Sequence, residues 1–432
     1  GRVTGKVRTI PADEALVLQC ESDGPSWRHC HIFLLELHGF TDVKSNVPSR
    51  SSSIFGLVAV LCLGTAGLFS AEPVWVAKPG PWGDLQVRTV YLEPPENILA
   101  VVAKPSSVTR WTFEQTTEKG VRATMEKAGL PSSLIDRLLG PTQVVASGNN
   151  VVVLPKVEDL MAMTEASRSA LYVELAKSSS NEYQHDPVFI HGGDVDDWLA
   201  ETEITKPQQE LLRKLLWRRG SALVFSDIQA LLALAKNSEE VAAVFRTITR
   251  VRSLLVELKL PLKDGRATFI DYWSAGSLNA DRLPFLVAIT RRRAPQMIDV
   301  TQFLPTLARR RVYTFPTTAM GLKGRLPDCH WTSLNFFEEE PKDLFLDSAK
   351  ASEHLLADYV AIDPPYKFGD ILCFLDDGEG LHTCVQVADD IVLTKNGESI
   401  LAPWTLMSLK DVDDIYRRSA DTRVQGYRLK GH

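Results

Sequence analysis

Two residues in the C-terminal third of the chain, Cys329 and His382, are of the types that perform nucleophilic catalysis. Cys329 follows Asp328, and the pattern predicts a helix that begins at the cysteine with Asp328 as its N-cap. The N–H groups and dipole of a helix N-terminus favour the thiolate, which is the nucleophilic form of cysteine. His382 lies in a run typical of a strand and shares one strand face with Cys384. A thiolate beside an imidazole predicts acyl transfer through a thioester.

Several elements must position this pair. The cysteine-bearing helix is expected to end before Pro341, and three strands are expected to follow it as an antiparallel meander. These strands are expected at 368–375, 381–387 and 391–397, with turns at 376–380 and 388–390. The residue that orients the imidazole should come from the last of the three strands.

The order of these motifs resembles the NlpC-type papain-like cysteine peptidases, which are bacterial cell-wall peptidases and related amidases. In that family Asp-Cys opens the core helix, Gly-Asp begins the first core strand, and the histidine lies on the next strand. The matching residues here are Asp328, Cys329, Gly369, Asp370 and His382. The resemblance covers about residues 310–432 and implies that the cysteine is the nucleophile and the histidine the general base.

The third position of the family is usually histidine and falls near Thr394 in this chain. A threonine hydroxyl orients an imidazole less firmly than a histidine does. Asn396, two residues further on the same strand face, has an amide oxygen that can accept the imidazole N–H. We therefore expect Asn396, or alternatively Thr394, to complete the site.

The resemblance implies a secreted bacterial cysteine hydrolase that cleaves an amide bond, with cell-wall peptides as its substrate. The Cys329 thiolate would attack the carbonyl, and His382 would protonate the leaving amine and then activate water. No cofactor is expected. Two alternatives stay open: a non-catalytic envelope binding or scaffold protein of the same fold, and an amidase or acyltransferase acting on lipid or small-molecule amides.

The neighbouring cysteines and histidine are expected to be structural. Cys373 and Cys384 fit strand packing, although two strand cysteines in an oxidising compartment could also form a cross-strand disulfide. His330 adjoins the nucleophile, but we expect its ring to point away from Cys329 and to lie at the surface.

A second polar cluster surrounds the connector at 187–193. His185, His191 and Asp194 could supply metal ligands, but a capped loop that leads into the next helix explains them as well. No metal is expected. The arginine triplets 291–293 and 309–311 are interpreted as solvated helix ends.

The fold class is α+β, with a small α+β domain at 72–185, a helical subdomain at 186–260 and the hydrolase domain at 261–432. Strands are expected at 85–92, 97–102 and 110–113, with a hairpin at 144–154. Helices are expected at 116–127, 132–139, 157–177, 207–219, 227–236 and 238–258.

The segment 54–69 is apolar, follows Arg50 and ends in small residues before the polar boundary after Ala71. This pattern predicts a signal peptide at 49–71 and therefore a secreted or periplasmic protein without a stable membrane span after its removal. The stretch 1–48 is expected not to belong to the native protein. A net charge of −6 with 44% hydrophobic residues indicates an ordinary globular chain and excludes nucleic acid as an expected partner.

Overall fold

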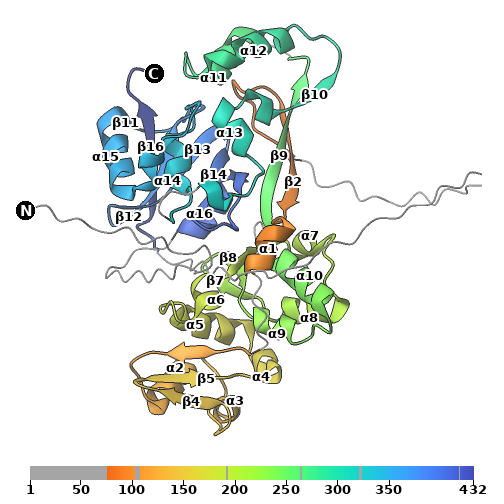
Figure 1. The fold of residues 1–432 in the computed structure, drawn as a ribbon, viewed down its shortest axis with the longest axis vertical. Helices are drawn as coiled ribbons and strands as arrows, with labels where there is room; N and C mark the ends of the chain where they lie inside the picture. The colour runs from red at the N-terminus through yellow and green to blue at the C-terminus, as the bar shows by residue number, and fades with distance from the viewer. Residues whose placement is uncertain (1–74, 103–107, 191–192, 263–264, 321–323, 418) are drawn as a thin grey trace, which may run out of the picture. The chain divides into compact units, whose positions relative to one another are not determined.

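The computed structural model describes residues 75–102, 108–190, 193–262, 265–320, 324–417 and 419–432. The expected signal peptide at 49–71 and the stretch 1–48 lie outside the described residues. The described part is a mixed α+β protein whose named strands all pair in antiparallel fashion, which confirms the expected fold class at this level (Figure 1).

The largest sheet contains the strands expected near the catalytic pair, in the order β11-β16-β12-β13-β14-β15. Its strands are β11 (Tyr359–Ile362), β12 (Ile371–Asp376), β13 (Glu379–Ala388), β14 (Ile391–Lys395), β15 (Trp404–Ser408) and β16 (Arg423–Leu429). The expected meander is therefore present as β12-β13-β14. Most of β13 is buried on both faces, because helices and a second sheet cover it.

A four-stranded sheet has the order β1-β2-β9-β10. Its strands are β1 (Trp75–Val76), β2 (Leu85–Leu92), β9 (Val251–Leu260) and β10 (Gln296–Asp299). Two three-stranded sheets lie between β2 and β9 in the sequence, in the orders β3-β5-β4 and β6-β8-β7. Their strands are β3 (Trp111–Phe113), β4 (Val144–Ser147), β5 (Asn150–Val153), β6 (Val188–Ile190), β7 (Trp217–Arg219) and β8 (Ala222–Phe225).

The helices are short and fall into two groups along the chain. The first group is α1 (Glu96–Val102), α2 (Glu118–Lys127), α3 (Ser132–Leu138), α4 (Val157–Ala162), α5 (Glu165–Leu175), α6 (Glu182–His185), α7 (Val195–Leu199), α8 (Lys206–Lys214), α9 (Ile228–Leu232) and α10 (Ser238–Thr249). The second group is α11 (Arg266–Ser274), α12 (Leu283–Thr290), α13 (Thr306–Arg311), α14 (Cys329–Leu334), α15 (Ser348–Asp358) and α16 (Leu409–Tyr416).

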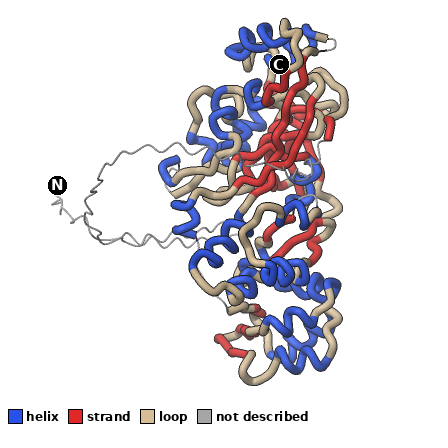
Figure 2. The backbone as a smooth tube through the Cα atoms, turned by 90° about the vertical axis from the view of Figure 1, so that its right-hand side faces the viewer, coloured by secondary structure: helices blue, strands red, loops and turns tan. Residues whose placement is uncertain are grey.

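The two larger sheets share one hydrophobic core. Apolar side chains of β2 and β9 pack with those of β13, β14 and β15. In Figure 2 most strands, drawn in red, lie together in the upper half of the view. A buried serine joins the sheets: the Ser253 hydroxyl donates to the Leu406 carbonyl and accepts from the Leu406 amide, both at 3.1 Å. This packing fixes the sheet that carries His382 against the four-stranded sheet.

Strand β9 is the main correction to the expected secondary structure. The helix expected at 238–258 ends at Thr249, and Val251–Leu260 is a strand between β2 and β10. Its apolar residues fit both periodicities, but Leu254, Val256 and Leu258 alternate and are buried. The segment is a strand because β2 and β10 flank it on both sides, and hydrogen bonds to these two strands satisfy its backbone N–H and C=O groups.

Other expected elements also differ. The strand expected at 97–102 is helix α1, and the Pro95 carbonyl accepts from the amides of its first turn. The helix expected at 157–177 is divided at Met163, because Thr164 caps α5 by accepting from the Ser167 amide at 3.1 Å. The segment expected to be a helical subdomain, 186–260, contains α7 to α10 but also the strands β6, β7, β8 and β9.

Candidate active site

Helix α14 presents Cys329 as expected, as its first helical residue. Asp328 is the N-cap: its Oδ1 accepts from the Trp331 amide at 2.8 Å, and its carbonyl accepts from the Thr332 hydroxyl at 2.6 Å. The helix ends at Leu334, well before the expected limit. Only 6% of Cys329 is exposed to solvent. A capped helix start therefore holds the thiol in a fixed, almost closed position.

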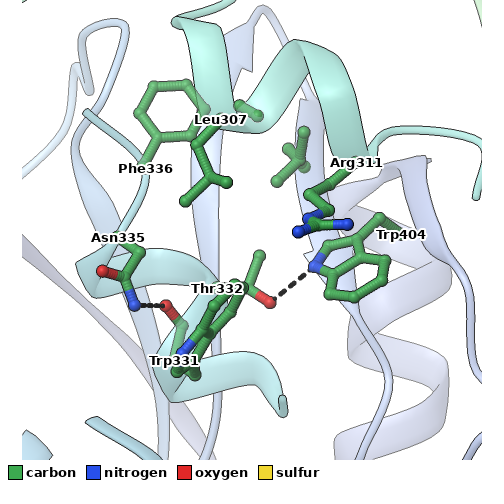
Figure 3. A pocket seen from close by; sticks show the side chains of 9 residues that line it. Leu307, Arg311, Trp331, Thr332, Asn335, Phe336 and Trp404 are labelled. Carbon is green, nitrogen blue, oxygen red and sulfur yellow. Dashed lines mark hydrogen bonds between the residues drawn. The ribbon is translucent and has the colours of Figure 1, made fainter. Parts of the chain in front are cut away.

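Helix α14 is anchored on the six-stranded sheet, where it contacts β13 and β14 (Figure 1). The Trp404 indole donates to the Thr332 hydroxyl at 2.9 Å, and the buried Asn335 amide donates to the Trp331 carbonyl at 2.9 Å. Figure 3 shows a cavity beside these groups, which Leu307 and Arg311 of α13 also line. Its volume of about 10 Å³ suffices for no more than one water molecule. It is therefore a packing defect and not a substrate groove.

His382 enters the site from β13 and is completely buried. Its Nε2 lies 2.8 Å from the Thr394 hydroxyl, whereas its Nδ1 has no conventional hydrogen-bond partner among the described residues. The ring of Tyr416, the last residue of α16, stacks on the imidazole with a centroid separation of 3.9 Å and an interplanar angle of 10°. Thr394 and Tyr416 thus fix the plane of the ring and leave Nδ1 as its available nitrogen.

The preferred orienting residue, Asn396, forms no hydrogen bond with His382 among the described contacts. Thr394 takes that position, and its hydroxyl donates to the Asn396 Oδ1 at 3.4 Å. The Asn396 amide group donates to the Met407 sulfur at 3.2 Å, which orients its oxygen toward the threonine. Because the Thr394 proton points to Asn396, its oxygen accepts the Nε2–H of His382. The two candidates therefore form a relay, with the threonine in contact with the ring and the asparagine behind it.

His330 is a site residue that the sequence-based interpretation missed. Its Nδ1 lies 3.2 Å from the Thr383 hydroxyl on β13, and the ring interacts with Cys329 instead of pointing away from it. The thiolate of Cys329 raises the pKa of His330 to about 9. The only sequence signal for this role was adjacency to the cysteine, because the hydroxyl that holds the ring comes from another element.

The electrostatics of the site favour an ion pair. Burial alone would raise the pKa of the Cys329 thiol, but the charges of His330 and His382 lower it well below its usual range. Burial, together with the charge of Cys329, raises the pKa of Asp328 to about 6. The buried thiol therefore interacts with two imidazoles, which favour its ionised form.

Cys373 and Cys384 are buried free thiols. Cys373 pairs with Thr383 across the β12–β13 ladder and Cys384 with Leu372, so the two sulfurs project from opposite faces of the sheet. The alternative of a disulfide between them is therefore wrong. Burial and the charge of Cys329 raise the pKa of Cys373 to about 12, which keeps this thiol protonated and unreactive.

The polar connector is a capping loop in the part that the structure describes. The Nδ1 of His185 lies 2.7 Å from the Ala176 carbonyl, and Asp194 caps α7 by accepting from the amides of Asp196 and Asp197. His191 lies outside the described residues. No group of three or more potential metal ligands comes together among the residues with described positions.

The arginine triplets lie at helix ends. Residues 291–293 follow α12 and are exposed, whereas residues 309–311 form the last turn of α13. Arg311 is not simply solvated, because it lies over the Trp404 ring at 5.7 Å and burial lowers its pKa.

In the described ranges, no helix combines the length and apolar character needed to cross a bilayer.

Comparison of the chain with protein-family models, with curated proteins and with solved structures found no match.

Proposed function

We propose that this protein is a cysteine hydrolase that cleaves an amide bond by a thiolate mechanism. The observation that carries the proposal is the electrostatic interaction of Cys329, at a capped helix start, with the buried His382, whose Nε2 is held by Thr394. The Cys329 sulfur would attack the carbonyl carbon, and His382 would give a proton to the leaving amine. His382 would then take a proton from water, and the hydroxide would release the acid from the thioester.

The arrangement of a cysteine-bearing helix against an antiparallel sheet supports the papain-like character that the sequence resemblance implies. The backbone N–H of Cys329 would help to bind the oxyanion at the helix start. Peptide amides of the bacterial cell wall are the proposed substrate class, and a secreted or periplasmic location follows from the signal peptide predicted at 49–71. Both rest on the sequence alone.

The closed state of the site favours a second candidate, a non-catalytic envelope protein that retains the fold. Cys329 is 6% exposed and His382 is fully buried, so a substrate carbonyl reaches the sulfur only if the covering groups move. A thiol probe such as iodoacetamide distinguishes the two. Alkylation of Cys329 in the folded protein at neutral pH supports the hydrolase, whereas a thiol that stays unmodified supports the non-catalytic protein.

Hydrolysis itself is tested with Cys329→Ala, assayed on cell-wall stem peptides by the appearance of new amino groups. Loss of the nucleophile is expected to lower the rate by about 10³-fold or more. Cys373→Ala is the matched control, because it removes another buried free thiol, on β12, that has no part in the proposed chemistry. Full activity in the Cys329→Ala protein would refute the proposal, provided that circular dichroism shows both variants folded.

A further inference from the structure

Helix α12 (Leu283–Thr290) is apolar on its exposed side as well as on its buried side. Its sequence, LPFLVAIT, contains no charged residue. Leu286 and Ile289 are buried in the core that the two larger sheets share, and Phe285 packs against that core. A helix at a protein surface ordinarily carries charged and polar residues on the side that faces water. Because α12 lacks them, its outer side is a candidate contact surface.

The outer side of α12 is formed by Leu283, Pro284, Val287 and Ala288. Leu283 is 42% exposed, Pro284 and Ala288 are also exposed, and Val287 is partly exposed. None of the four packs into a hydrophobic cluster of the described residues. Spacings of three and four residues put them on one side of the helix. In Figure 1, α12 lies beside α11 at the top of the view.

Three exposed arginines, Arg291–Arg293, follow the helix directly. None of them forms an ion pair with a residue that the structure describes. Arg291 keeps helical backbone angles, and its amide donates to the Ala288 carbonyl at 3.3 Å, so it continues the apolar side of the helix. At the other end of α12, Arg282 pairs with Asp281 at 2.6 Å and adds no net charge. The apolar side therefore ends in uncompensated positive charge.

We propose that the outer side of α12, together with Arg291–Arg293, binds the surface of an anionic lipid bilayer. The apolar side chains would enter the boundary between head groups and acyl chains, and the guanidinium groups would donate hydrogen bonds to lipid phosphates. The eight residues of α12 form a helix only about 12 Å long, which lies on a bilayer and does not cross it. This binding is independent of the proposed hydrolysis.

The combination of apolar and basic groups favours lipid over an acidic protein or a nucleic acid. Either of those partners would match the arginines, but its polar surface would gain little from contact with Leu283 and Pro284. An anionic bilayer offers both negative phosphates and an apolar layer beneath them. The chain as a whole carries a net charge of −6, so attraction to a negative surface must come from a local cluster of positive charge.

The test is co-sedimentation of the full chain with vesicles of phosphatidylcholine alone, or of phosphatidylcholine with about one third phosphatidylglycerol. The unaltered protein should bind the anionic vesicles more tightly, and added salt should weaken this binding. The triple variant Arg291→Gln, Arg292→Gln, Arg293→Gln should bind them more than about tenfold more weakly, since each arginine near an anionic surface contributes roughly a factor of five.

The matched control for charge is the triple variant Arg110→Gln, Lys119→Gln, Lys127→Gln. These three residues are exposed and lie elsewhere in the chain, so both triple variants have the same net charge. The control should bind as the unaltered protein does. All variants also share the apolar segment 54–69, so a difference between them reports α12 and its arginines alone.

The apolar contribution is tested with Leu283→Ser combined with Val287→Ser. This variant should bind vesicles of both compositions more than about tenfold more weakly, because two apolar side chains no longer enter the bilayer. The matched control is Leu344→Ser combined with Leu356→Ser, which removes two leucines that are 47% and 69% exposed elsewhere on the surface. The control should bind normally, and circular dichroism should show that all variants are folded.

Two results would overturn the proposal: no binding of the unaltered protein to anionic vesicles, or equal binding by the arginine variant and its charge-matched control. Arginine-dependent retention on heparin by a protein that binds no vesicle would also overturn it, because the arginines would then serve an acidic macromolecule. Hydrolysis of soluble stem peptides should be unchanged in the arginine variant, so failure of lipid binding and failure of the proposed function are distinguishable.

Discussion

At the residue scale, the chemistry of the site depends on which nitrogen of His382 carries its proton. Thr394 decides this, because its own proton is directed to Asn396 and its oxygen therefore accepts from Nε2. From the sequence we expected Asn396 before Thr394, because an amide oxygen is the stronger acceptor. In the structure, the register of β13 and β14 places the Thr394 hydroxyl, and not the Asn396 amide, within hydrogen-bond distance of the His382 ring.

Thr394→Val is expected to lower amide hydrolysis by roughly 10- to 100-fold, less than the full contribution of a general base. The valine keeps the volume of the side chain but leaves Nε2 without an acceptor, so the ring loses its preferred tautomer. Rates on stem peptides and ¹⁵N shifts of the imidazole measure the effect.

Thr405→Val is the matched control for this variant. Thr405 is the direct partner of Thr394 on β15, is fully buried, and has a hydroxyl without a hydrogen-bond partner among the described residues. Its replacement should leave the rate and the shifts unchanged. Equal losses in both variants would mean that strand packing, and not the hydroxyl, is responsible.

At the element scale, the start of α14 combines a stabilising cap with a costly charge. The Asp328 carboxylate accepts from the Trp331 amide, but burial and the Cys329 thiolate raise its pKa to about 6. The folded state therefore binds the Asp328 proton more tightly than the unfolded chain, in which the pKa is about 4. Stability from this group is complete below about pH 4 and is lost as the pH rises through 6.

Asp328→Asn is expected to remove that penalty, because asparagine caps a helix about as well as aspartate does but carries no charge. Urea unfolding should show the variant more stable than the unaltered protein at pH 7.5, with little difference at pH 4. Asp347→Asn, at the exposed N-cap of α15, is the control: the backbone amide of Lys350 lowers the pKa of Asp347, so this variant should gain no stability at pH 7.5 relative to pH 4. A gain in stability of equal size at both pH values would contradict the explanation.

At the scale of the whole molecule, long-range contacts join segments that the sequence suggested as separate domains. Strand β9, from the segment expected to be helical, pairs with β2 and β10, which lie in the two flanking expected domains. Arg252 on β9 also donates to Asp411 of α16 at 2.8 Å, and both side chains are largely buried. Because these contacts cross the expected boundaries, the sheets should lose their structure together.

Asp411→Ala is expected to destabilise the protein by about 3 kcal/mol, since it leaves the Arg252 guanidinium buried without its partner. Asp413→Ala is the control on the same helix, because its ion pair with Arg417 is more exposed and is expected to contribute less than about 1 kcal/mol. Denaturant unfolding followed by fluorescence and by circular dichroism measures both. Similar losses of unfolding free energy in the two variants would show that the buried Arg252–Asp411 ion pair contributes no more than an exposed one.

The sequence by itself determined the local features of the site: the capped helix start at Cys329, the three-strand meander, and the α+β class. These depend on capping, turn chemistry and alternation within a few residues, which short-range physics controls. Only the tertiary structure decided that 251–260 is a strand, that Thr394 and not Asn396 meets His382, that Cys373 and Cys384 face apart, and that His330 belongs to the site. Each of these follows from the pairing register or from a neighbour distant in sequence, and no local pattern encodes which strand lies beside which.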